Sequence, residues 1–111
     1  MAETDRYIGK GFKKDILKVM IMTHLSRKPG YPYALIKAVH HKKIWIMEGM
    51  TKNDVYNTMA ALEREGFIKS RTAKAGAVIR KNYLLTQKGR HIVKESKKAM
   101  MRSFREVIKM M

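Results

Sequence analysis

The sequence contains no cysteine, only two prolines and no long apolar run. The absence of cysteine excludes disulfide bonds and thiolate chemistry. Every apolar run falls short of the roughly 20 residues that a membrane-spanning helix needs, which predicts no membrane partner. The N-terminus is polar and partly acidic, unlike a secretory leader. The expected location is therefore the cytoplasm.

Catalytic and metal-binding patterns are absent too. The serines lack a plausible histidine and acid context, and there is no glycine-rich phosphate loop. The four histidines are His24, His40, His41 and His91. No cysteine or carboxylate cluster joins them, and the adjacent pair would point to different sides of a helix. The sequence therefore predicts that the protein is not an enzyme and that it has no metal site and no cofactor.

Acidic residues are scarce, and this is the strongest compositional signal. The 111 residues include 25 Lys and Arg against 9 Asp and Glu, which gives a formal net charge of +16. A chain this basic repels itself unless a polyanion is near. Nucleic acid is the expected polyanion, and an acidic membrane surface or an acidic protein is the minority alternative. The length predicts one domain, and 45% apolar residues supply a modest core.

The best-defined local pattern is a helix over residues 51–65. Thr51 is its expected N-cap, and Asp54 stands at the position of a capping-box acid. The expected buried face carries Val55, Met59 and Leu62. Gly66 is suited to the left-handed conformation that ends many helices. This helix therefore has a defined start, a defined end and one apolar face.

A β-hairpin is expected directly after this helix. Residues 67–72 predict a strand, residues 73–77 a turn of small residues, and residues 78–85 the return strand. From Lys69 to Arg90 no acidic residue interrupts the basic ones. A positively charged hairpin beside a helix with a polar face suits contact with nucleic-acid phosphates and bases. The pattern is that of the second half of a winged helix.

Three segments of this region resemble the PadR family of transcriptional regulators. Tyr56 comes six residues before Leu-Glu-Arg-Glu-Gly-Phe-Ile at 62–68, and Arg-Lys-Asn-Tyr-Leu-Leu-Thr-Gln-Lys-Gly-Arg follows at 80–90. They are similar to the family's succession of Tyr, Leu-Glu-x-x-Gly-Leu-Ile, a basic wing and Tyr-x-Leu-Thr-x-x-Gly. The chain departs from the family where Gly-Tyr is usual and Pro32-Tyr33 stands instead.

The resemblance implies a fold and a function. The expected fold class is mainly α with a small β-hairpin wing, a winged helix-turn-helix plus a long C-terminal dimerisation helix. Three parts are expected: an N-terminal arm over 1–11, a winged-helix DNA-binding domain over 12–85 and the dimerisation helix over 86–111. The expected function is sequence-specific regulation of transcription, as a nucleoid-associated repressor that binds double-stranded DNA as a homodimer.

Two further helices are expected before the capped one. In the first, over residues 12–27, one stripe comprises Phe12, Ile16, Val19, Met20 and Thr23, and further apolar surface comes from Leu17, Ile21, Met22 and Leu25. Such a helix is either buried all round or shared between a core and a subunit interface. The second helix is expected from Pro32 to His40, with Leu35, Ile36 and Val39 facing inward.

Residues 41–50 form an unusually apolar connection that includes Ile44, Trp45 and Ile46. The simpler interpretation is a lid over the small core. The alternative is contact with an effector or with another subunit. PadR-like proteins often respond to small hydrophobic or phenolic ligands at the dimer interface, so the resemblance makes Trp45 the candidate effector-binding residue.

The last helix is expected over residues 86–111, with Thr86 as its cap. Its apolar stripe is too long for one small domain to cover, and the economical solution is a homodimer. PadR-like proteins also dimerise through a C-terminal helix. The expected interface joins this stripe to the first helix and comprises Ile16, Met20, Val93, Met100, Phe104, Val107, Ile108 and Met111.

The candidate DNA contacts fall into two groups. The polar face of the helix over 51–65, expected in the major groove, carries Lys52, Asn53, Tyr56 and Asn57. The wing over 69–81, expected on the phosphate backbone, carries Lys69, Arg71, Lys74, Arg80 and Lys81. The alternative function keeps the fold but makes the protein non-specific, either chromatin-like or bound to ribosomal RNA. A third option, a protein-interaction module, is disfavoured by the acid-free wing.

Overall fold

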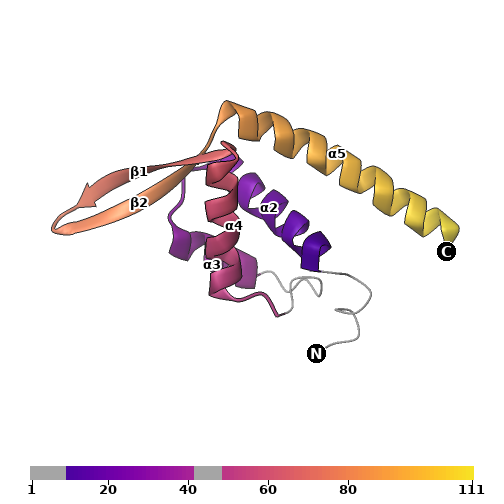
Figure 1. Cartoon of the computed structure of the whole chain (residues 1–111), viewed down its shortest axis with the longest axis horizontal. Helices are drawn as coiled ribbons and strands as arrows, with labels where there is room; N and C mark the ends of the chain where they lie inside the picture. Colours follow the sequence, from indigo (N-terminus) through magenta and orange to yellow (C-terminus); the bar gives the residue numbers. More distant parts are fainter. Residues whose placement is uncertain (1–9, 42–48) are drawn as a thin grey trace.

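The computed structural model describes residues 10–41 and 49–111. Its elements, in chain order, are α2 (Lys10–Arg27), α3 (Pro32–His41), α4 (Lys52–Arg64), β1 (Ile68–Ala75), β2 (Val78–Leu85) and α5 (Gln87–Met110) (Figure 1). Helices α2, α3 and α4 lie together, the hairpin projects to one side and α5 runs off toward the other. These two projections make the molecule elongated, with extents of 55 × 32 × 22 Å. The arrangement confirms the predicted class, mainly α with a hairpin wing.

The side of α2 that faces the core is formed by the apolar residues beside the predicted stripe. Its buried apolar residues are Leu17, Ile21, Met22 and Leu25. Ile16 and Met20 of the stripe are only half-buried, and Phe12 is 38% exposed. Because the middle of this helix is apolar nearly all round, its periodicity could not select the inward face. The half-buried stripe favours the alternative in which α2 serves both the core and a subunit interface.

Helices α3 and α4 bury the faces that the sequence predicts. The buried set comprises Leu35, Ile36 and Val39 of α3 with Val55, Met59 and Leu62 of α4. The hairpin and α5 close the same cluster with Ile68, Tyr83, Leu85 and Val93. Full burial of one such side chain is worth about 1.5–3 kcal/mol relative to exposure. This shared core fixes the base of the hairpin against α4.

The hairpin is longer and its turn tighter than predicted. Strands β1 and β2 pair in antiparallel register along their full lengths. The turn is Gly76–Ala77 alone, in place of the five-residue turn predicted over 73–77. Gly76 has φ +65°, and no residue other than glycine in the described part of the chain has a positive φ. A positive φ at the first of two turn residues is typical of type II′, which matches the twist of paired strands.

The second edge of β2 pairs with the connection between α2 and α3. The Gly30 amide donates to the Tyr83 carbonyl at 3.0 Å, and the Tyr83 amide donates to the Gly30 carbonyl at 2.6 Å. This bridge joins the base of the wing to the helix-turn-helix. It also brings Tyr31 beside Arg80, whose guanidinium lies 5.3 Å from the centre of the tyrosine ring.

The end of α4 redirects the chain into the wing. The Gly66 amide donates to the Glu63 carbonyl at 3.0 Å, and the Phe67 amide donates to the Leu62 carbonyl at 2.9 Å. Gly66 itself has φ +81°. These two bonds and the left-handed glycine define a Schellman motif, as the position of Gly66 predicts.

The start of α5 is held against this same turn. Thr86 caps the helix, because its Oγ1 accepts from the Gly89 amide at 3.0 Å and also donates to the Gly66 carbonyl at 2.7 Å. Gly89 is buried, and a Cβ added there would overlap the carbonyl oxygen of Phe67. The helix can therefore approach the α4–β1 turn this closely only through glycine.

Candidate nucleic-acid interface

A capping box fixes the start of α4. The Asp54 amide donates to Thr51 Oγ1 at 3.2 Å, and the Thr51 amide donates to Asp54 Oδ2 at 2.8 Å. Within the helix, Thr58 is buried and its hydroxyl donates to the Asp54 carbonyl at 2.7 Å. The predicted cap is confirmed. It gives the first turn of α4, where Lys52 and Asn53 lie, a defined position relative to the core.

The outer face of α4 is polar and open to solvent. All four predicted contacts on this helix are exposed: Lys52, Asn53, Tyr56 and Asn57. Tyr56 is 47% exposed, so its side chain is accessible on this face. Ala60, one turn further on, is also exposed and leaves little bulk on this face. The helix therefore presents amides, an ammonium and a phenol on one accessible surface.

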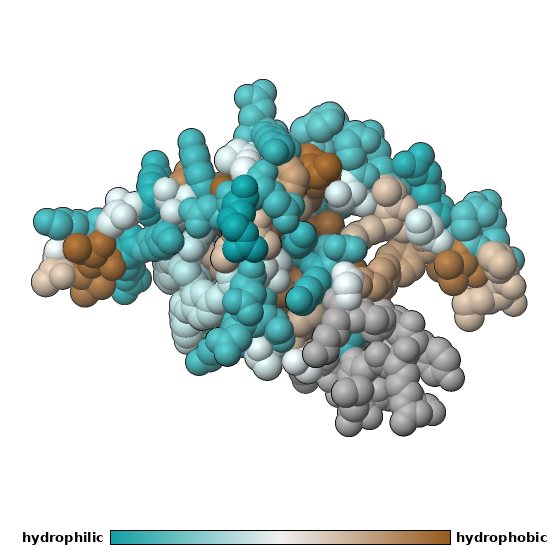
Figure 2. Space-filling view, viewed as in Figure 1, coloured by the Kyte–Doolittle hydropathy of each residue, from teal (hydrophilic) through white to brown (hydrophobic). Residues whose placement is uncertain are grey.

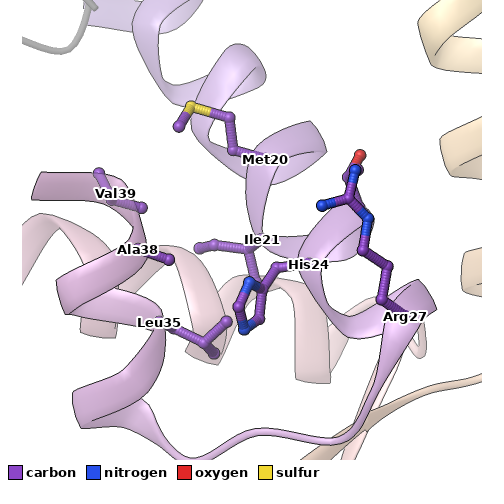
Figure 3. A pocket seen from close by; sticks show the side chains of 8 residues that line it. Met20, Ile21, His24, Arg27, Leu35, Ala38 and Val39 are labelled. Carbon is purple, nitrogen blue, oxygen red and sulfur yellow. The ribbon is translucent and has the colours of Figure 1, made fainter. Parts of the chain in front are cut away.

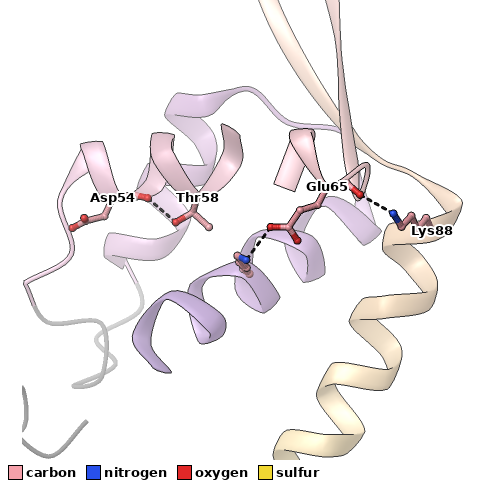
Figure 4. Close-up of polar contacts among 5 residues, drawn as sticks. Asp54, Thr58, Glu65 and Lys88 are labelled. Carbon is pink, nitrogen blue, oxygen red and sulfur yellow. Dashed lines mark hydrogen bonds and ion pairs between the residues drawn. The ribbon is translucent and has the colours of Figure 1, made fainter. Parts of the chain in front are cut away.

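The carboxylates at the far end of α4 are engaged in structural contacts, and Figure 4 shows those of Glu65. Glu65 Oε1 lies 3.1 Å from Lys18 Nζ of α2, and the Glu65 carbonyl accepts from Lys88 Nζ at 2.8 Å. Glu63 Oε2 accepts from the Ser70 hydroxyl of β1 at 2.7 Å. As a partly exposed pair, Lys18–Glu65 contributes at most about 1 kcal/mol. Neither Glu63 nor Glu65 forms an ion pair with a cation of the wing in the described part of the chain.

All five predicted phosphate contacts of the wing are exposed: Lys69, Arg71, Lys74, Arg80 and Lys81. None of them forms an ion pair with a carboxylate of residues 10–41 or 49–111. The pairing register places Arg71, Arg80 and Lys69 on one face of the hairpin, and Lys74 and Lys81 on the other. The wing therefore offers cations on both faces.

A hollow lies where α3, α4 and β2 meet. It has a volume of about 530 Å³ and is lined by Tyr31, Pro32, Tyr33, Tyr56, Arg80 and Lys81. Two of the cations that the sequence assigns to the wing thus meet three phenols and the N-terminus of α3 at one place. Cations, hydroxyl donors and a helix N-terminus all favour an anion.

Tyr31 and Tyr33 are site residues that the sequence analysis did not select. They are 38% and 62% exposed. Their position beside Arg80 depends on the bridge between Gly30 and Tyr83, a contact between residues far apart in the chain. The only local signal is two exposed aromatic residues at the start of a helix.

The residues predicted for a dimer interface separate into three groups. Val93 is buried in the core of the protomer, at 6% exposure. Ile16, Met20 and Met100 are half-buried. The outermost group is exposed and comprises Phe104, Val107, Ile108 and Met111. Phe12 of α2 meets Phe104 edge to face, with ring centres 6.1 Å apart, so the two predicted surfaces are continuous.

A small cavity of about 180 Å³ lies between α2 and α3 (Figure 3). The side chains of Ile21, Leu35 and Val39 line its apolar part, and the His24 ring points into the same space. The Thr23 hydroxyl at its edge is buried and has no hydrogen-bond partner within the described residues. Trp45, the predicted effector contact, lies outside the described residues, and the effector remains a prediction.

Within residues 10–41 and 49–111, no group of three or more His, Cys, Asp or Glu is arranged to hold a metal ion. None of the helices in that part of the chain is both long and apolar enough to cross a membrane.

The chain is similar to known proteins in sequence and in fold. The model of the Transcriptional regulator PadR-like family matches residues 21–95. The structure of a PadR family transcription regulator from Clostridium difficile R20291 is 25% identical, with a TM-score of 0.71, over 85% of this chain and 95% of its own. A padr family transcriptional regulator from Eggerthella lenta DSM 2243 is 26% identical, with a TM-score of 0.76, over 90% of this chain and 85% of its own.

A third solved structure supports the fold alone. It is a PadR-like transcriptional regulator from Bacillus cereus strain ATCC 14579, 20% identical with a TM-score of 0.77, over 91% of this chain and 96% of its own. No sequence among the curated proteins matches the chain. The family match covers more than half of the residues and includes α3, α4, both strands, the C-terminal part of α2 and the start of α5.

Proposed function

The chain belongs to the PadR-like family of transcriptional regulators, and we propose that it is a homodimeric repressor that binds double-stranded DNA at specific sequences. In this proposal α4 enters the major groove and the wing lies on the neighbouring backbone or minor groove. The protein acts at the nucleoid. A transcriptional regulator is not an enzyme, and no catalytic step is invoked.

The observation that carries the proposal is the contrast between α4 and the wing. Helix α4 exposes Asn53 and Asn57, which can form paired hydrogen bonds with adenine, whereas the wing exposes five cations without a carboxylate partner in the described residues. Amide groups read base edges, and cations neutralise phosphates. The two surfaces thus supply the two kinds of contact that a sequence-specific regulator needs.

The exposed apolar end of α5 supports the homodimer. Phe104 and Ile108 are 40% and 69% exposed, and Val107 between them is 55% exposed. A cavity of about 280 Å³ lies further back between α2 and α5, lined in part by Val19, Met22 and Met100. A second copy of the chain would cover both features by placing its α5 along α2 and α5 of the first.

A two-fold dimer makes quantitative predictions for DNA binding. Its operator is an inverted repeat whose half-sites lie about one helical turn, roughly 34 Å, apart. If the dimer neutralises roughly six to eight phosphates, the logarithm of the association constant falls with the logarithm of salt with a slope of about −5 to −7.

The experiment is a binding titration across a salt series. The purified protein is titrated into the DNA upstream of its own gene and into a scrambled duplex of equal length. The expected result is at least a thousandfold preference for the native duplex at physiological salt. Equal affinity for both duplexes would overturn the regulator and favour the non-specific chromatin-like or RNA-bound alternative, which the net charge of +16 also supports.

A further inference from the structure

The tip of the wing is apolar, although the rest of its surface is cationic. Val78 and Ile79, directly after the turn, are 54% and 64% exposed. Figure 2 shows this end of the hairpin as a hydrophobic patch bordered by hydrophilic residues, far from the apolar end of α5. Exposure of two adjacent β-branched side chains to water is unfavourable, and a partner that covers them would remove this cost. The cations behind them restrict which partner that is.

The two apolar side chains point to opposite faces of the hairpin. Val78 shares its face with Arg80, and Ile79 shares the other face with its cross-strand partner Lys74 and with Lys81. Each face therefore repeats the same order, an apolar residue at the tip and one or more cations behind it. A flat partner, such as a membrane or an apolar protein surface, would be met by one face only. A groove with two negatively charged walls meets both.

The tip also reaches far enough to enter a second groove. Tyr83 is the buried residue of β2 nearest the tip, and Val78 lies five positions closer to the tip. At about 3.4 Å per residue this is roughly 17 Å of exposed strand. The major groove that α4 would occupy is about 12 Å wide. A hairpin that leaves the body beside α4 can therefore extend past the groove edge to the flanking minor groove.

We propose that Val78 and Ile79 form an apolar wedge that enters the minor groove beside the half-site and bends the DNA there. The inference rests on the proposed function, because it concerns how the same wing contacts the same duplex. Lys74, Arg80 and Lys81 lie behind the wedge and face the phosphates of the two groove walls. The wedge adds contact with the sugars and base edges, which cations alone do not supply.

Insertion of this tip requires a change in the DNA. A sheet with side chains on both faces is about 10 Å thick, whereas the minor groove of B-DNA is about 6 Å wide. The groove must open, and the duplex bends toward the major groove as it does so. Pyrimidine–purine steps open most easily, so the protein prefers TA or CA steps at the outer flanks of each half-site, at positions that no amide or guanidinium reads.

Fluorescence resonance energy transfer between the ends of a bound duplex tests this proposal. The duplex is obtained from a random library by repeated selection with the full-length protein. The test variant is the double substitution Val78→Thr and Ile79→Thr, which keeps both residues β-branched and exposed and therefore leaves the strand intact. The wild type shortens the end-to-end distance of the bound duplex. The variant leaves it close to that of free DNA and loses about tenfold in affinity, with an unchanged salt slope.

The matched control is the double substitution Lys74→Gln and Arg80→Gln. It lowers the salt slope but retains the bend once the duplex is saturated with protein. An equal bend with wild type and Val78→Thr/Ile79→Thr would overturn the wedge while leaving specific binding intact. Failure of the wild type to select any duplex would overturn the proposed function itself. Binding of the wild type to phosphatidylglycerol vesicles, lost in the same variant while DNA bending persists, would assign the tip to a membrane and also overturn the wedge.

Discussion

The hairpin and the far half of α5 both project from the core, and they differ in the chemistry that they expose. The hairpin carries five cations that form no ion pair with a carboxylate in the described part of the chain, and it has two apolar residues at its tip. The far half of α5 carries Arg102, Arg105 and Lys109 against Glu106, which lies 3.5 Å from Lys109, and it exposes an apolar stripe that the hairpin lacks. An unbalanced cationic surface requires a polyanion. An exposed apolar stripe along a helix is suited to another copy of itself.

The two projections meet at Gly89, and the largest expected effect comes from that residue. In Gly89→Ala the new Cβ overlaps the Phe67 carbonyl, and the helix must move away from the α4–β1 turn. We expect a loss of about 3 kcal/mol in the free energy of unfolding, measured by urea titration. Gly11→Ala is the matched control, because a Cβ there meets nothing within 4 Å. Equal stability of the two variants would contradict the packing described for α5.

The next largest effect is expected from substitutions on the apolar stripe of α5, which leave the wing unchanged. Phe104→Glu with Ile108→Glu places two carboxylates on the apolar stripe, and we expect a monomer in sedimentation equilibrium. Its affinity for the selected duplex should fall at least a hundredfold, because each half-site then binds alone. The matched control is Arg102→Glu, which helical periodicity places on the opposite side of α5. This variant should remain dimeric. If the double variant remained dimeric, α5 would not be part of the dimer interface.

A smaller effect separates base readout from phosphate contact. Asn57→Ala should cost about 1–3 kcal/mol of binding free energy on the selected duplex and nothing on a scrambled one. Lys69→Gln should weaken binding to both duplexes equally and reduce the magnitude of the salt slope by about 1 per chain. Fluorescence anisotropy titrations on both duplexes distinguish these patterns. A uniform loss with Asn57→Ala would assign α4 to backbone contact alone.

The smallest effect concerns the cap that fixes the start of α4. Thr51→Ala removes the hydroxyl that accepts from the Asp54 amide. We expect the free energy of unfolding, measured by thermal denaturation, to fall by about 1 kcal/mol. Thr51→Ser keeps that hydroxyl and should be nearly neutral. A larger loss in DNA affinity than in stability would show that the cap positions Lys52 and Asn53 as well as holding the helix. Equal stability of both variants would argue against the capping box.

Local signals in the sequence predicted most of the α4–wing segment. Thr51, Asp54 and Gly66 define both ends of α4 through contacts within a few residues, and the structure contains each of them. The hairpin was predicted too short because small residues over 73–77 resemble a turn. Pairing across the hairpin extends β1 to Ala75, and only Gly76 needs a positive φ.

Features that depend on distant contacts could not be predicted locally. The inward face of α2 could not be selected from the sequence, because its apolar residues surround the helix. The hollow beside Tyr31 and Arg80 exists because Gly30 pairs with Tyr83, more than fifty residues away. The contribution of Val93 to the core of the protomer depends on how closely Gly89 lets α5 approach. In each case the missing information is tertiary packing, which periodicity does not encode.

The central claim is that the wing binds DNA and that α5 binds a second copy of the chain. Its most direct test is the stoichiometry and footprint of the complex with a selected duplex. Sedimentation velocity gives the number of chains per duplex, and hydroxyl-radical cleavage gives the protected positions on each strand. We predict two chains per duplex and two protected half-sites related by a two-fold axis, about one helical turn apart. One chain per duplex, or protection without two-fold symmetry, would contradict the assignment of the wing to DNA and of α5 to a second copy.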